Sequence, residues 1–201
     1  LRQRLERLRE APDIAPDEVS ASLEQTEKII ATFNALLRIA QIEAGDRREQ
    51  FERTDLAQIV VNVAEVFEPA AEDEGISLNV DVPEDGLEVF GDRGMLTQLL
   101  SNLVENAIKH CPSGTAMEIS CWSSPTGTTL RVVDSGPGID AVDHERVFRR
   151  FFRGEKSRSS PGNGLGLALV KAIAEMHGAS IHIYENRPGT AFEIRFPGKF
   201  G

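Results

Sequence analysis

Two asparagines and a lysine at helical spacing are the first residues in this chain that could do chemistry. Asn102, Asn106 and Lys109 stand at i, i+4 and i+7, so a helix would carry them on one stripe, with His110 beside them. Asparagine is a mediocre helix former, and two on one stripe suggest a use for their amide oxygens. Because Mg²⁺ takes oxygen ligands and keeps several waters and substrate phosphates, one amide oxygen could suffice to hold it. An ordinary solvated helix face would show the same stripe.

A carboxylate followed by glycines is the second candidate. Asp134 ends an apolar strand pattern and precedes the run Ser135-Gly136-Pro137-Gly138-Ile139. A carboxylate at a strand end can accept a hydrogen bond from an exocyclic amine, and glycines let a flat ring approach the backbone. A common turn that begins with aspartate has the same composition, so this alternative stays open.

The third candidate is a glycine-rich start of a helix. The run Gly162-Asn163-Gly164-Leu165-Gly166-Leu167 leads into apolar residues at helical spacing. Amide groups at such a helix start, together with the helix dipole, attract phosphate. The spacing partly matches a dinucleotide fingerprint, but no buried parallel strand leads into it, so we reject that match. Residues 153–161 have a composition suited to a mobile lid or to an ordinary surface loop. Together, the three candidates predict a nucleotide site.

Composition and charge exclude several classes of protein. With 201 residues and 40% hydrophobic content, the chain can bury a core. A net charge of −10 argues against a nucleic-acid binder or a binder of anionic membranes, although the local basic run within residues 149–158 could serve a small polyanion. The two cysteines, Cys111 and Cys121, lack metal-ligand spacing and favour structural roles in a reducing compartment. No apolar window is long enough for a membrane span.

The N-terminal part predicts helices that need a partner. Leu1, Leu5 and Leu8 are typical of the end of an amphipathic helix, so we expect a chain truncated at its start. A long helix should run from about Asp17 to Gly45. Its apolar positions follow spacings of 4 and 3, namely Val19, Leu23, Thr26, Ile30, Phe33, Leu37 and Ala40. A helical hairpin that doubles into a dimeric four-helix bundle would cover this stripe, and packing against the rest of the chain is the alternative.

The remaining elements must position the three candidate segments. We expect helices over 55–75, 93–110 and 165–177, and strands over 76–82, 87–90, 117–122, 128–133, 180–184 and 191–196. This mixed order predicts an α+β fold, a two-layer sandwich with helices on one face of a mixed, mostly antiparallel sheet. The charged stretch 46–53 marks the boundary, so we predict a truncated helical hairpin over 1–49 and a second domain over 50–201.

In this order and spacing, the segments resemble the ATP-binding catalytic domain of bacterial sensor histidine kinases, within the superfamily shared with DNA gyrase, heat-shock chaperones and MutL. The resemblance covers residues 51–196. Its motifs are the N box at 102–110, the first glycine box at 134–139, the F box at 147–153, the second glycine box at 162–167 and the last short motif, Gly189-Thr190. The helical hairpin resembles the dimerisation and phosphotransfer domain of this family.

The resemblance implies ATP and Mg²⁺ as ligands and assigns roles to individual residues. Asn106 should coordinate Mg²⁺ with Asn102 assisting, and Asp134 should accept from the adenine amino group. The catalytic candidates are Glu105, which would assist proton removal, and the phosphate-facing Lys109, Arg150 and Arg153. Further nucleotide contacts are expected from His110, where the family often has an aromatic residue, and from Gly136, Gly138, Ile139, Phe151, Gly162, Gly164, Leu165, Gly166, Leu167 and Thr190.

The resemblance also implies a reaction and partners. A sensor kinase of this family would transfer the γ-phosphoryl group of ATP to a histidine of its dimerisation helix, for relay to an aspartate in the receiver domain of a response regulator. None of the chain's four histidines lies in the first helical segment, so we expect a fragment that lacks its acceptor. It should form a homodimer through its N-terminal helices, bind no nucleic acid, and meet a membrane only through a segment absent here, as a cytoplasmic domain of an inner-membrane sensor. A gyrase- or chaperone-type ATPase and a non-catalytic nucleotide-sensing module are the alternatives.

Overall fold

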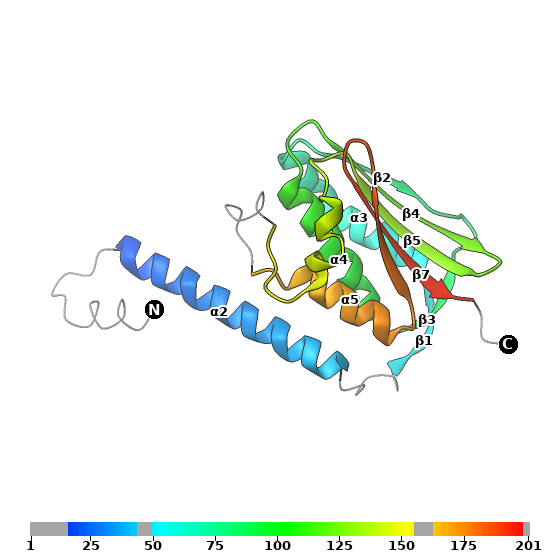
Figure 1. The fold of residues 1–201 in the computed structure, drawn as a ribbon, viewed down its shortest axis with the longest axis horizontal. Helices are drawn as coiled ribbons and strands as arrows, with labels where there is room; N and C mark the ends of the chain where they lie inside the picture. Colours follow the sequence, from blue (N-terminus) through cyan, green and yellow to red (C-terminus); the bar gives the residue numbers. More distant parts are fainter. Residues whose placement is uncertain (1–15, 44–49, 155–162, 199–201) are drawn as a thin grey trace.

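Helices and a sheet form two packed layers in the main body of the molecule. The computed structural model describes residues 16–43, 50–154 and 163–198 (Figure 1). A five-stranded sheet has the strand order β2-β4-β5-β7-β6, and three helices lie on one face of it. The strands are β2 Ser77–Asp81, β4 Ala116–Ser124, β5 Gly127–Asp134, β6 Ser180–Glu185 and β7 Thr190–Pro197. The helices are α3 Leu56–Asp73, α4 Arg93–His110 and α5 Gly166–Met176.

The sheet is antiparallel except at one edge. The β4–β5, β5–β7 and β6–β7 pairs are antiparallel, whereas β2 pairs with β4 in parallel. In this register Asp134, the last residue of β5, lies opposite Thr190, the first residue of β7. The predicted two-layer α+β sandwich with a mixed, mostly antiparallel sheet is therefore confirmed.

Helix α4 carries the predicted polar stripe because its other face is anchored in the core. Leu99, Leu100 and Val104 are fully buried in the cluster that also includes Leu130 of the sheet. The helix begins after Asp92, whose side chain accepts a hydrogen bond from the Met95 amide and caps the first turn. Burial of one face and capping of the start therefore fix the rotation of the other, polar face.

A second, two-stranded sheet is formed by two short segments of the main body. Strand β1 (Glu52–Asp55) pairs with β3 (Glu88–Gly91) in antiparallel fashion. The sequence predicts the β3 strand but interprets residues 46–53 as a charged boundary, so β1 is a correction. Only Thr54 of its four residues is buried, and such a short, mostly exposed strand has no alternating apolar pattern to reveal it.

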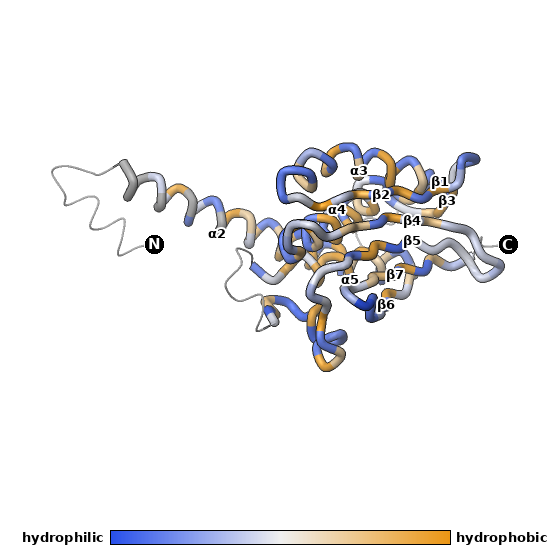
Figure 2. Tube along the Cα trace, turned by 90° about the horizontal axis from the view of Figure 1, so that it is seen from above, coloured by the Kyte–Doolittle hydropathy of each residue, from blue (hydrophilic) through white to orange (hydrophobic). Residues whose placement is uncertain are grey.

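The N-terminal helix α2 (Pro16–Glu43) extends away from the main body, and its C-terminal part packs on α5 (Figures 1 and 2). Ile39 and Ile42 are buried there. By contrast, Leu23, Ile30, Phe33 and Leu37 of the predicted stripe are exposed. Two faces of one helix therefore have different environments. The first arm of the expected hairpin, with Leu1, Leu5 and Leu8, lies outside the described residues.

No helix in the described part of the chain is both long and apolar enough to span a bilayer.

Candidate functional site

A cavity of about 1140 Å³ brings most of the predicted site residues together. It lies between α4, the end of β5, the start of α5 and the loop that carries the short 3-10 helices Ala141–Asp143 and Arg146–Phe148. The predicted residues that line it are Asn102, Glu105, Asn106, Lys109, His110, Asp134, Gly138, Ile139, Phe151, Arg153, Gly164, Leu165, Gly166, Leu167 and Thr190. Segments from both halves of the domain therefore converge on one hollow.

Asp134 is buried and held by backbone donors. The residue is only 9% exposed, and its Oδ1 accepts hydrogen bonds from the Gly136 amide at 2.9 Å and the Thr190 amide at 3.3 Å. These bonds satisfy one carboxylate oxygen and leave acceptor capacity on the other. The arrangement suits an acceptor for a ligand N–H group at the wall of the cavity.

Cys111 is a cavity residue that sequence reasoning assigned to a structural role. It follows α4 directly, and burial raises the pKa of its thiol to about 12, with further contributions from the charge of Asp134 and a hydrogen bond to it. The thiol is therefore a neutral donor to the carboxylate. A Cβ at Gly136 would lie 2.5 Å from the Cys111 sulfur, so this glycine is required for the close approach. Gly136 itself does not line the cavity, although we predicted that it contacts the nucleotide.

The two asparagines of α4 line the cavity, and Asn102 presents its amide oxygen toward the start of α5. The Asn102 Nδ2 donates to the Gln98 carbonyl at 2.8 Å, which orients its Oδ1 away from its own helix. A Cβ at Gly166 would lie 3.1 Å from that Oδ1. Asn106, one turn later, is half-buried and lines the same cavity. Amide oxygens are suitable Mg²⁺ ligands when waters and phosphates complete the shell. Within the described residues, no group of three His, Cys, Asp or Glu side chains could hold a metal without such help.

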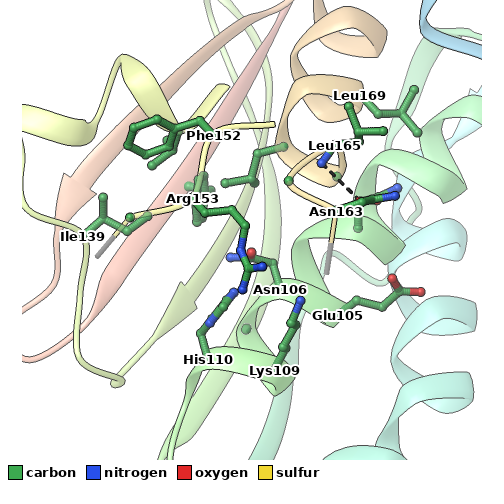
Figure 3. A pocket seen from close by; sticks show the side chains of 18 of the residues that line it. Glu105, Asn106, Lys109, His110, Ile139, Phe152, Arg153, Asn163, Leu165 and Leu169 are labelled. Atoms are coloured by element: carbon green, nitrogen blue, oxygen red, sulfur yellow. Dashed lines mark hydrogen bonds between the residues drawn. The ribbon is translucent and has the colours of Figure 1, made fainter. Parts of the chain in front are cut away.

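Three cationic or titratable side chains crowd one end of α4. Figure 3 shows Arg153 extending toward His110 and Lys109, while Glu105 lies on the other side of the view. Burial lowers the pKa of Lys109, and the charge of Arg153 lowers it further. Burial also lowers the pKa of His110, followed by the charges of Lys109 and Arg153, and Asp134 opposes this shift. Mutual repulsion of this kind favours a polyanionic ligand that would relieve it.

Arg150 does not line this cavity, in contrast to the prediction that it faces phosphates. Its Nη2 donates to both carboxylate oxygens of Glu43, at 2.5 and 2.6 Å, at the end of α2. The cause is the fold itself, because α2 packs beside this loop and offers an acid within reach. Arg153, three residues later, lines the cavity instead.

The F box and the second glycine box contact each other through their backbones. Phe151 has a positive φ of 63°, and its amide donates to the Gly164 carbonyl at 2.9 Å. A Cβ at Gly164, whose φ is 66°, would lie 2.8 Å from the Phe152 carbonyl oxygen, so glycine is needed. The Asn163 side chain accepts from the Leu165 amide at 3.3 Å just before α5 begins (Figure 3). Gly162 lies outside the described residues.

Helix α2 contributes cavity residues that sequence reasoning did not assign to the site, namely Ala31, Asn34, Ala35 and Arg38. Among the described residues, Arg38 Nε and Gln98 Oε1 are buried polar atoms without a hydrogen-bond partner, and both residues line the cavity. Buried polar atoms are normally satisfied, so these two suggest a polar ligand or water at this wall. Asn34 and Arg38 are spaced i, i+4, which is typical of a polar helix face but does not reveal what that face contacts.

Comparisons with known proteins all find histidine kinases. Residues 91–199 match the family described as histidine kinase-, DNA gyrase B-, and HSP90-like ATPase. The sensor-like histidine kinase SenX3 of Mycolicibacterium smegmatis is 34% identical over 190 residues, which are 92% of this chain and 49% of that protein. The probable sensor histidine kinase TcrY of Mycobacterium tuberculosis is 31% identical over 194 residues, 96% of this chain and 40% of that protein. The chain thus spans half or less of the length of these relatives.

Solved structures show the same fold. The mycobacterial sensor histidine kinase MprB is 32% identical, with a TM-score of 0.65 over 74% of this chain and 98% of that chain. The Acinetobacter baumannii histidine kinase AdeS, at 24% identity, has a TM-score of 0.80 over 99% of this chain and 93% of that chain. The second likeness concerns the fold alone, and it extends over α2 as well as the sandwich.

Proposed function

Since this chain belongs to the sensor histidine kinases, within the family of histidine kinase-, DNA gyrase B- and HSP90-like ATPases, we propose that its cavity binds ATP with Mg²⁺. One observation supports this most: a buried acid, a pair of amide oxygens and a cluster of cations lie on different walls of one cavity. Asp134 accepts a hydrogen bond from the adenine amino group. The remaining walls serve the phosphates and the metal.

Asn106 holds the metal through its amide oxygen, and Asn102 assists. When bound, Mg²⁺ neutralises phosphate charge. Lys109 and Arg153 face the phosphates, and His110 lies beside them. The amides at the start of α5 add the positive end of the helix dipole, at Gly166 and Leu167. Arg150 reaches the phosphates only when its ion pair with Glu43 opens.

We further propose that the whole protein transfers the γ-phosphoryl group to a histidine of its dimerisation domain, for relay to a response-regulator aspartate. Positioning and charge compensation are the main sources of catalysis in phosphoryl transfer. Glu105, exposed beside Asn106, would assist proton removal at the acceptor. The acceptor is not in α2, because none of the four histidines lies there, so we assign it to a segment outside this chain.

Sensor histidine kinases dimerise and signal to response regulators. For this chain we propose a homodimer through α2, because its exposed apolar residues Leu23, Ile30, Phe33 and Leu37 recur at spacings typical of a bundle interface. The opposite residues, Ile39 and Ile42, are already covered by the chain itself. The receiver domain of a response regulator is the second expected partner. A cytoplasmic location of this part stays a prediction from the family.

Calorimetry with ATP tests the binding proposal. We expect binding in magnesium buffer that weakens when the metal is chelated, and no self-phosphorylation from labelled ATP. An added acceptor domain that contains the family's phosphorylated histidine should become labelled. Absence of ATP binding in magnesium buffer would contradict the assignment.

The same assays separate the kinase from its alternatives. Steady release of inorganic phosphate would favour an ATPase, and binding without turnover or transfer would favour a nucleotide-sensing module. The ATPases of this superfamily are expected to carry their water-activating acid one turn before the metal-binding asparagine. That position is Asn102 here, whose amide nitrogen donates to the Gln98 carbonyl, so no acid is present at it. We therefore favour phosphotransfer.

A further inference from the structure

The turn between β6 and β7 holds the backbone of Asp134 from outside the cavity. The Nδ2 of Asn186 donates to the Asp134 carbonyl oxygen at 2.9 Å. The amide of Asn186 donates to the Gly189 carbonyl at 3.1 Å and closes the turn. A carbonyl oxygen only accepts, so the donor must be the amide nitrogen of Asn186. Asn186 does not line the cavity, but it is hydrogen-bonded to Asp134, which does.

Close backbone contact reinforces this hydrogen bond. Gly189 has a φ of 115°, and a Cβ there would lie 1.8 Å from the Asp134 carbonyl oxygen and 2.8 Å from the Ser135 Cα. The next residue, Thr190, pairs with Asp134 in the β5–β7 register and donates its amide to the Asp134 Oδ1. The turn therefore contacts both the peptide and the carboxylate of Asp134.

The carboxylate depends on this support because its two bonds to backbone amides are uneven. The Gly136 amide lies 2.9 Å from Oδ1, but the Thr190 amide lies 3.3 Å away, beyond the usual length of such a bond. Hydrogen bonds weaken steeply as their angle departs from linearity. The purine base of a bound nucleotide is rigid, and its phosphates hold it from the other side of the cavity. A small rotation of the Asp134 backbone would therefore misalign the carboxylate with the base.

We propose that Asn186 is a positioning residue for base recognition, holding the Asp134 backbone so that the carboxylate meets the 6-amino group of the purine. This inference rests on the proposed function and deepens it, because it names a residue outside the cavity that sets selectivity for adenine. Asn186 acts through Asp134 alone and does not touch the nucleotide.

The test compares two nucleotides and three variants by calorimetry in magnesium buffer. ATP carries the 6-amino group, and purine riboside triphosphate lacks it. Asn186→Ala removes the donor, and Asn186→Asp keeps the side-chain size but cannot donate to a carbonyl, which provides a second variant if the truncation unfolds. Arg187→Ala is the matched control, because Arg187 lies in the same turn but pairs with Glu185 and has an 88% exposed side chain.

We expect both Asn186 variants to lose about three- to tenfold in affinity for ATP, the range for one ordinary hydrogen bond, and less than about twofold for the analogue. The control should keep wild-type affinity for both. Unchanged ATP affinity in both Asn186 variants would overturn the inference. Equal losses for both would also overturn it, since a merely structural residue lowers all binding. A wild-type chain that binds neither nucleotide would instead overturn the proposed function on which the inference rests.

Discussion

One carboxylate oxygen of Asp134 accepts hydrogen bonds from backbone amides, which hold the side chain in place. A substitution that removes only the charge therefore measures how much that charge contributes to ATP binding. We expect Asp134→Asn to weaken ATP binding by about 1.5 to 3 kcal/mol, the range for a hydrogen bond to a charged group. Calorimetry measures the change. Glu118→Gln, which likewise replaces an acid with its amide but at an exposed position of β4, is the control. An unchanged ATP affinity in Asp134→Asn would remove this residue from its assigned role.

His110 provides a second measurement at the residue scale, based on pH. Burial, then Lys109 and Arg153, lower its pKa below 6.5, so it is neutral at pH 7 without ligand. A nearby triphosphate would raise that pKa, and binding would then take up a proton. ATP affinity should therefore rise as pH falls from 8 through the bound-state pKa, and the gain should end below the lower ligand-free pKa.

The control for this pH dependence is His110→Phe, which keeps a flat ring but has no titratable nitrogen. The phosphates of ATP also titrate in this range, and their effect is common to both proteins. The informative quantity is the ratio of the two affinities measured at each pH. A ratio that stays constant from pH 8 to 5.5 would place His110 away from the phosphates.

At the scale of elements, the ion pair between Glu43 and Arg150 links α2 to the F box. Glu43→Gln should release Arg150 and allow it to reach the phosphates. Exposed ion pairs are weak, so we expect ATP affinity to rise by only a factor of about two to five. Glu27→Gln, an exposed change on the same helix, is the control. Equal or weaker ATP binding in Glu43→Gln would show that Arg150 has no phosphate role in this chain.

His177 contacts three separate segments of the chain, and one of these contacts requires its neutral form. Its Nε2 accepts from the Asp92 amide at 3.1 Å, its Nδ1 contacts the Ile173 carbonyl at 2.7 Å, and its ring stacks on Phe51. A protonated ring could not accept from Asp92. Burial lowers its pKa below 6.5, so the unfolded chain binds the proton more readily than the folded one.

The free energy of unfolding should therefore fall as pH drops below about 6.5, the unfolded-state pKa of histidine. Urea unfolding at pH 7.5 and pH 5.5 measures the effect. His177→Gln replaces the imidazole with an amide that can hydrogen-bond but does not titrate; this variant should be less stable at pH 7.5 and should lose less stability between the two pH values. Parallel losses in both proteins would assign the acid sensitivity to other groups. His182, exposed on β6, is a suitable control position for the same substitution.

At the scale of the whole molecule, the exposed stripe on α2 predicts self-association. Phe33 is 59% exposed and central to that stripe. Phe33→Glu would bring like charges together at a symmetric apolar interface, so we expect the dimer dissociation constant to rise by about a hundredfold or more. Sedimentation velocity over a concentration series measures it. Val66→Glu is the control, because Val66 is equally apolar and 72% exposed on α3. A wild-type chain that stays monomeric would contradict the homodimer.

Much of this molecule could be predicted because local rules govern it. The apolar spacing on residues 93–110 predicts α4 with the observed bounds, and the polar stripe of Asn102 and Asn106 follows from the opposite buried face. Alternating patterns predict the strands of the main sheet. The types of residue in the motifs, an acid before glycines and amides on one stripe, predict a nucleotide site without any tertiary information.

Contacts between distant segments were decided only by the tertiary structure. Sequence alone could not tell Arg150 from Arg153, because the choice depends on Glu43, which lies 107 residues away from Arg150 in the chain. It likewise could not place Cys111 beside Asp134, or Asn186 behind it. The spacing of apolar residues predicts which face of a helix or strand is buried, whereas the packing of the complete chain decides what that face contacts. The sequence therefore determined the kind of site, and the fold determined which side chains complete it.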